Sequence, residues 1–172
     1  MSITIRHAEP ADYAACTLIY AQPRAAAGTL QIPLQSTEVW KKRLENMAPQ
    51  DRILVAVLGG EVVGNLGLHP VANLRRAHAA GIGMAVRDDA QGKGVGSALL
   101  KAAVDLADNW LNLLRLELTV WTDNEAAQRL YRAHGFVLEG THRAYALRHG
   151  RYVDAHAMAR LHPSPPSVAA PT

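Results

Sequence analysis

A chain of 172 residues, 49% of them hydrophobic, is long enough to bury one core and close to the usual size of one domain. The formal charge of +3 suits an anionic small ligand, but the Lys and Arg residues are scattered, unlike those of a nucleic-acid-binding surface. A lone cysteine, Cys16, excludes an intrachain disulfide and a Cys/His metal framework, and no apolar run approaches the roughly 20 residues that cross a bilayer. We expect a cytoplasmic protein with no metal and no nucleic-acid or membrane partner.

The first third of the chain predicts one strand and two helices. Alternating polar and apolar residues predict a strand over residues 2–8, and apolar residues at helical spacing predict a helix from residue 11 to Pro23. Residues 24–35 have no period and form a long connection, which is typical of a substrate loop and equally of a variable surface loop. Ser36 is expected to cap the second helix.

The middle of the chain predicts three strands. The β-rich runs over residues 52–58 and 61–68 are separated by two glycines, which predicts an antiparallel hairpin. A further strand over residues 78–86 is poor in bulky side chains. Its glycines, Gly81 and Gly83, indicate a bulge or the close approach of a ligand or another backbone.

The remaining elements are a helix over residues 95–111, a strand over 114–121, a helix over 124–134, and a hairpin of strands over 136–147 and 152–160. The order is β α α β β β α β α β β, which predicts an α/β fold with a mixed sheet flanked by helices, in one domain of residues 1–161. The strand-helix-strand unit over residues 78–121 requires two parallel strands. Residues 162–172 hold four of the nine prolines and are predicted to be a disordered tail.

A glycine-rich turn, Gln91 to Ser97, opens the helix of that unit. A helix N-terminus exposes unpaired backbone N–H groups and the positive end of the helix dipole. Glycines allow a phosphate to approach those groups without interference from a Cβ, and Gly92, Gly94 and Gly96 supply them here. The turn is therefore a candidate anion-binding site.

The spacing within the turn distinguishes three kinds of phosphate site. A P-loop requires Gly-Lys followed by Ser or Thr, but the Gly-Lys pair here is followed by another glycine. A dinucleotide fingerprint requires a third glycine where Ser97 stands, and the repeated strand-helix-strand units of that fold are missing. The pattern Gln/Arg-x-x-Gly-x-Gly is matched in full by Gln91, Gly94 and Gly96.

Three segments carry a resemblance to a known family: residues 86–97, 124–131 and 134–136. With them the chain resembles the GNAT superfamily of acetyl-CoA-dependent N-acetyltransferases from the first strand to about Arg160. Residues 5–9, 108–111 and 145–154 are similar to bacterial L-amino-acid N-acetyltransferases and phosphinothricin-type acetyltransferases. The resemblance implies a homodimer that transfers the acetyl group of acetyl-CoA, by direct attack in a ternary complex, to the α-amine of a small L-amino acid or analogue.

The resemblance also assigns residues to the acetyl-CoA site: Met84, Ala85, Val86, Gln91, Gly92, Lys93, Gly94, Val95, Gly96, Ser97, Asn124 and Tyr131. The turn would bind the pyrophosphate, and the backbone of the preceding strand would pair with the pantetheine arm and stabilise the oxyanion. Tyr131 matches the family's general acid, although a tyrosine at this spacing also suits a helix packed on a core. Asn124 suits both a helix cap and a contact to acetyl-CoA.

The general base is the part of the pattern that this sequence lacks. Relatives often carry Glu or Asp in the middle of the strand before the turn, where this chain has Ala80 and Gly81. Deprotonation of the amine is then expected through ordered water, or through Glu117 or His78. Further candidates for substrate contact are Arg75 and Arg76, which could pair with a carboxylate, and Gln31 in the long loop.

Two other functions fit the same residues. Acetylation of a protein N-terminus or of a polyamine would require an open groove with acidic walls. An acyl-CoA-binding module without catalysis would fit the missing carboxylate.

Overall fold

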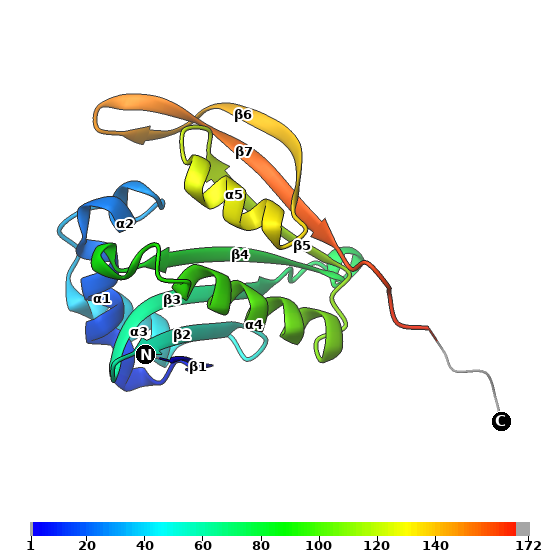
Figure 1. Ribbon diagram of the computed structural model, residues 1–172, viewed down its shortest axis with the longest axis horizontal. Helices are drawn as coiled ribbons and strands as arrows, with labels where there is room; N and C mark the ends of the chain where they lie inside the picture. The colour runs from blue at the N-terminus through cyan, green and yellow to red at the C-terminus, as the bar shows by residue number, and fades with distance from the viewer. Residues whose placement is uncertain (1, 168–172) are drawn as a thin grey trace.

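The computed structural model describes residues 2–167, and these residues contain one seven-stranded sheet in the order β1-β2-β3-β4-β5-β7-β6 (Figure 1). The strands are β1 (Ile3–His7), β2 (Arg52–Leu58), β3 (Glu61–Pro70), β4 (Ala79–Val86), β5 (Arg115–Trp121), β6 (Val137–Arg148) and β7 (Arg151–Leu161). All neighbouring strands are antiparallel except β4 and β5. The predicted α/β class and the predicted parallel pair are confirmed.

The helices are α1 (Tyr13–Ala21), α2 (Pro23–Ala27), α3 (Thr37–Glu45), α4 (Val95–Asn109) and α5 (Glu125–Ala133), with short 3-10 turns η1 (Pro10–Asp12), η2 (Leu74–Arg76) and η3 (Asp88–Ala90). Helix α2 corrects the sequence-based expectation, which left residues 24–35 as a loop. Pro23 begins it, because a proline needs no partner for its missing N–H at the first helical position. Five residues are too few to show a helical period, so the pattern could not reveal it.

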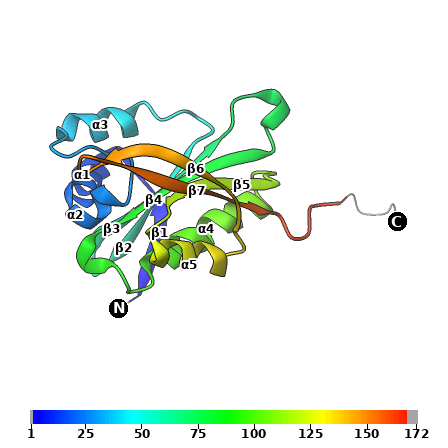
Figure 2. The ribbon, with the colours of Figure 1, turned by 90° about the horizontal axis from the view of Figure 1, so that it is seen from above.

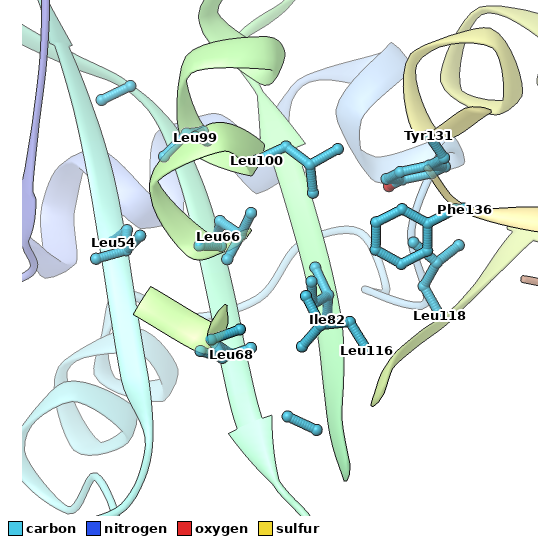
Figure 3. Packing of buried hydrophobic residues seen from close by; sticks show 14 of the residues in the cluster. Leu54, Leu66, Leu68, Ile82, Leu99, Leu100, Leu116, Leu118, Tyr131 and Phe136 are labelled. Atoms are coloured by element: carbon cyan, nitrogen blue, oxygen red, sulfur yellow. The ribbon is translucent and has the colours of Figure 1, made fainter. Parts of the chain in front are cut away.

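The sheet is covered on both faces (Figure 2). Helices α4 and α5 pack on one face, against side chains such as Leu54, Leu66 and Leu68 (Figure 3). Helices α1, α2 and α3 cover part of the other face, where Cys16 and Trp40 are buried. Because side chains alternate along a strand, each strand contributes to both layers.

The strands β4 and β5 separate after a short parallel contact. Only three residue pairs are in register, from Ala79 with Arg115 to Gly81 with Glu117, although β4 continues to Val86. The other edge of β4 stays paired with β3 over its whole length. The two strands diverge visibly in Figure 1, and the free edge of β4 faces the space between them.

The end of the chain follows β7. Residues 162–167 form no helix or strand, and the remainder of the predicted tail, residues 168–172, lies outside the described residues. None of the helices described here is both long and apolar enough to span a membrane.

Candidate active site

A cavity of about 920 Å³ lies where β4 and β5 separate. One side, which we call the turn side, is formed by residues from two segments, 84–97 and 124–131. The opposite side, the sheet-face side, is formed by Tyr20, Trp40, Arg43, Asn65, Gly67 and His69. The two sides differ in construction, because backbone groups dominate the first and side chains the second.

The glycine turn has the backbone geometry of an anion site. Gly92 and Gly94 have φ angles of 73° and 85°, which favour glycine, and Gly94 is the N-cap of α4. The N–H of Ala98 donates to the Gly94 carbonyl at 3.0 Å, as the first α-helical hydrogen bond. The N–H groups of residues 95–97 therefore have no α-helical acceptor and are available to a ligand.

Two contacts hold the turn in place. A Cβ on Gly96 would lie 3.0 Å from Leu130 Cδ2 and 3.6 Å from Met84 Cε, so the glycine lets α4 start directly against α5 and β4. The side chain of Gln91 donates from Nε2 to the Val86 carbonyl at 3.1 Å. The turn is thereby fixed to the end of β4.

Ser97 is positioned from outside the turn. Its Oγ lies 2.9 Å from Nε2 of His134, at the end of α5. Burial, with a smaller effect of Arg160, lowers the pKa of His134. The imidazole is therefore neutral near pH 7, and the contact between the two side chains is one between neutral groups.

The free edge of β4 forms the floor of the cavity. Residues 82–86 continue the strand past its last pair with β5, so their outward backbone groups are not used by the sheet. A Cβ on Gly81 or Gly83 would meet no heavy atom within 4 Å. An open strand edge beside empty space is a template for pairing with an extended ligand.

Tyr131 reaches the cavity from α5. Its ring packs at 5.8 Å between centroids on Phe136, and Figure 3 shows the hydroxyl on the side that faces β4. Burial raises the pKa of the phenol to about 12, which keeps the hydroxyl protonated at neutral pH. Both sequence interpretations of this residue fit the geometry, since Tyr131 is a core side chain that also lines the cavity.

Asn124 is the N-cap of α5. Its Oδ1 accepts a hydrogen bond from the Ala127 N–H at 3.1 Å, and the residue also lines the cavity. The capping interpretation is confirmed, and it leaves the amide nitrogen available to a ligand.

The cavity lining includes most of the residues proposed from the sequence: Gln31, Met84, Ala85, Val86, Gln91, Gly92, Gly94, Val95, Gly96, Ser97, Asn124 and Tyr131. Lys93 belongs to the turn but not to the lining. Arg76, His78 and Glu117, which were candidates for substrate contact, also lie outside it.

Glu117 is held by two arginines. Arg76 Nη2 lies 2.8 and 2.7 Å from its two carboxylate oxygens, and Arg115 Nε lies 2.9 Å from Oε2. Partial burial raises the pKa of Glu117, but the hydrogen bonds from Arg115 and Arg76 outweigh it, and the net pKa is lowered. A carboxylate held in its ionised form by two cations is a weak base, and Arg76 is already paired.

The sequence analysis missed a cluster on the sheet-face side. The Tyr20 ring stacks on Trp40 at 4.7 Å, and the Tyr20 hydroxyl donates to Asn65 Oδ1 at 2.9 Å. Arg43 lies 4.4 Å above the Trp40 ring. His69 completes the group on β3. The available signal was the presence of Asn65 and His69 in a strand that is apolar after Glu61, and both residues line the cavity.

Another aromatic and arginine pair lines the cavity from β5 and β6. Arg148 lies 5.9 Å from the Trp121 ring centroid and forms an ion pair with Asp123. This arginine is therefore neutralised by a carboxylate that lines the same cavity.

Asp88 joins α2 to the segment before the glycine turn. Its carboxylate accepts the N–H groups of Arg24 and Ala25, both at 3.0 Å, which are orphan donors at the start of α2. The side-chain oxygen of Gln22 accepts the N–H of Asp88 at 2.8 Å in return. Helix α2 is thereby fastened to the segment that leads into the glycine turn.

Comparison with known proteins agrees with this geometry. The profile of the acetyltransferase (GNAT) family matches residues 18–136. The L-amino acid N-acetyltransferase AaaT of Escherichia coli (strain K12) is 45% identical over 159 residues, which are 92% of this chain and 98% of that protein.

Solved structures give the same result. A GNAT-family acetyltransferase from Streptococcus pneumoniae is 28% identical, with a TM-score of 0.79 over 93% of this chain and 99% of that one. A GNAT-superfamily phosphinothricin acetyltransferase from Sinorhizobium meliloti, solved in complex with AcCoA, is 25% identical, with a TM-score of 0.83 over 94% and 89%. The chain belongs to the acetyltransferase (GNAT) family.

Proposed function

We propose that this acetyltransferase transfers the acetyl group of acetyl-CoA to the α-amine of a small L-amino acid or close analogue. The observation that carries the proposal is the charge of the cavity. Its lining contains three arginines, Arg24, Arg43 and Arg148, and one carboxylate, Asp123. A surplus of cationic groups favours an acceptor with a carboxylate and disfavours a polyamine, which would need acidic walls.

The turn side fits acetyl-CoA. Free N–H groups at the start of α4 suit the pyrophosphate, and the open edge of β4 suits an extended arm that has amide groups. A Cβ on Gly92 would meet no heavy atom within 4 Å, so the space in front of the turn is open. The support is therefore the shape and the donors of this side, together with the AcCoA complex of the S. meliloti relative.

Catalysis requires stabilisation of an oxyanion and protonation of the departing thiolate. The unpaired N–H groups of β4 can donate to the oxyanion, and the Tyr131 hydroxyl can supply the proton. No acyl-enzyme is needed. The only cysteine, Cys16, is buried, and burial raises the pKa of its thiol to about 12, so it is not an activated nucleophile.

Arg43 is the residue best placed to receive the acceptor's carboxylate. Within residues 2–167, Arg24 has Asp88 as an ion-pair partner and Arg148 has Asp123, whereas no carboxylate lies within 4 Å of Arg43. Its guanidinium lies over the Trp40 ring. This contact orients the guanidinium plane but does not neutralise its positive charge. Gln31 lines the same region.

The test is release of free CoA thiol from acetyl-CoA with a panel of acceptors. Small L-amino acids should react, while the matching amines without a carboxylate, spermidine and peptides with a free N-terminus should react at least tenfold more slowly at equal concentration. Preference for spermidine or for a peptide would overturn the substrate class. Tight CoA binding with no turnover on any amine would instead indicate a binding module.

We further propose that residues 1–161 act as one domain, as a cytoplasmic homodimer. A single sheet that uses strands from residue 3 to residue 161 supports the domain. Support for the dimer comes from apolar side chains exposed on the terminal hairpin: Val137, Leu138, Leu147 and Tyr152. Light scattering of the purified chain tests the dimer, and a single species of monomer mass at micromolar concentration would reject it.

A further inference from the structure

One row of side chains crosses the exposed part of the sheet face at the edge of the cavity. His69 on β3 is in register with Gly81 on β4, and Gly81 with Glu117 on β5. Asp51 directly precedes β2 and is the next residue of the row, with its Oδ2 3.0 Å from His69 Nδ1. Ala80 and Gly81 stand where the family resemblance implies a carboxylate, so a histidine with a carboxylate partner is the cross-strand neighbour of one of these two positions.

The contact with Asp51 orients the ring. The carboxylate faces Nδ1, which leaves Nε2 as the ring nitrogen that can take a proton from a substrate. The His69 side chain is 51% exposed, while that of Asp51 is 21% exposed. A substrate in the cavity can therefore reach the imidazole, whereas the Asp51 carboxylate is less accessible.

Two glycines, Gly67 and Gly83, leave room for Nε2 of His69. A Cβ on Gly67 would lie 2.4 Å from His69 Nε2, so the ring lies directly over Gly67 and any other residue there would displace it. Gly67 is in register with Gly83, which belongs to the free edge of β4. Neighbouring strands are about 4.8 Å apart, so Nε2 lies about one strand spacing from that edge, across open space.

We propose that His69 is the general base of the acetyl transfer and that Asp51 is the residue that positions it. The inference rests on the function proposed above, because it requires an amine in the space over Gly81 and Gly83. It is an alternative to deprotonation through ordered water, and it replaces the two side-chain candidates, since Glu117 is bound by two arginines and His78 lies outside the cavity lining.

The proton balance of the reaction is complete with these residues. The lone pair of His69 Nε2 takes one proton from the substrate ammonium, which yields a neutral amine and an imidazolium beside the Asp51 carboxylate. The amine nitrogen then bonds to the thioester carbon. The C–S bond breaks as Tyr131 gives its proton to the sulfur and recovers one from the new amide nitrogen. The imidazolium releases its proton to water, so the products are amide, thiol and one proton.

The pH dependence of kcat is affected by the charged groups around His69. These groups are Asp51 before β2, Arg43 on α3, and Glu117 on β5 with Arg76 and Arg115. Of these, only Asp51 contacts the ring. The arginine pair neutralises Glu117, and Arg43 is assigned to the carboxylate of the acceptor.

The decisive variant is His69→Asn. Asparagine keeps a donor at the position of Nδ1 and removes the basic nitrogen, so the contact with Asp51 and the fold are preserved. At pH 7 we expect kcat to fall about 100-fold or more, with an unchanged KM for acetyl-CoA and unchanged CoA binding by calorimetry. The loss should shrink about tenfold per pH unit as the pH approaches the pKa of the substrate amine, because the free amine then needs no base. His7→Asn, on the exposed edge strand β1, is the matched control.

Two outcomes would overturn the proposal. One is a kcat of His69→Asn within threefold of the parent value at pH 7, and the other is a loss of the same size at every pH, which would indicate a structural role. Asp51→Asn should lower kcat by a smaller factor, and an unchanged rate there would remove Asp51 from the mechanism. If the parent enzyme acetylates no amino acid, the proposed function fails; if it is active and His69→Asn equals it, only the base assignment fails.

Discussion

The two sides of the cavity are built in different ways. The turn side uses two short segments of the chain, and its donors are backbone N–H groups at glycines with positive φ and along the free edge of β4. The sheet-face side uses side chains from α1, α3 and β3 that meet only in the folded protein. In the proposed function, the first side binds acetyl-CoA, which every acetylation shares. The second can change its preference through single substitutions.

The largest expected effect is on the chemical step, where the two sides meet. Tyr131→Phe removes only the hydroxyl, so kcat should fall about 100-fold or more, with both KM values close to the parent. Because burial raises the pKa of Tyr131 to about 12, the phenol stays protonated and the parent enzyme should lose no activity through this group between pH 7 and 10. Steady-state kinetics over that range test both points. Tyr13→Phe, which lies outside the cavity lining, should be unchanged.

The second-largest effect is expected on stability, at Asp108, which belongs to neither side of the cavity. Asp108 pairs with Arg160 through two hydrogen bonds of 2.8 and 2.7 Å, and Arg160 is only 8% exposed. Asp108→Asn leaves a buried guanidinium without its counter-ion and should cost about 3 kcal/mol of unfolding free energy. Urea denaturation measures it. Asp105→Asn, one turn earlier on the exposed face of α4, should change the free energy by less than about 0.5 kcal/mol.

A glycine pair tests whether the turn side is a backbone site. Gly94 and Gly60 have almost the same φ, 85° and 86°, so valine at either position should cost about 1–3 kcal/mol of stability. Only Gly94→Val should weaken CoA binding, by about tenfold or more, because only Gly94 leads into the free N–H groups of α4. Calorimetry with CoA separates the two. Equal affinities would show that the turn does not hold the phosphates.

The sheet-face side is tested by Arg43→Gln. Loss of one charged hydrogen-bonding partner should raise the KM for amino acids about tenfold and leave the KM for acetyl-CoA unchanged. Acceptors without a carboxylate should show no change. Lys42→Gln serves as the control, because Lys42 lies on the same helix but does not line the cavity. A rise in the KM of every acceptor would argue against carboxylate recognition by Arg43.

The smallest effect is expected at Cys16, beneath the sheet-face side. Burial, followed by the charge of Asp12, raises the pKa of the thiol to about 12, so at pH 8 it should not react with a disulfide reagent within minutes. The same thiol should react at once in denaturant. Rapid reaction of the folded protein would show that the layer of α1 and α3 opens.

Sequence reasoning succeeds on the turn side because its information is local. Periodicity predicted the strands and the long helices, and the spacing of Gln91, Gly94 and Gly96 carried the resemblance to the family. It failed for α2, which is too short to show a period. It also passed over His69, whose meaning depends on Asp51 18 residues earlier in the sequence and on two glycines that clear its surroundings. Such pairings depend on strand register, which no local pattern contains.

The short parallel contact between β4 and β5 has a further consequence. Only three registered pairs join the four-stranded part of the sheet, β1 to β4, to the part formed by β5, β7 and β6. In the proposed complex, acetyl-CoA lies along the remaining edge of β4 and fills the space between the two parts of the sheet. Bound acetyl-CoA then also stabilises the folded enzyme. The free energy of unfolding in a cell would therefore rise with the concentration of acetyl-CoA, which the enzyme itself consumes.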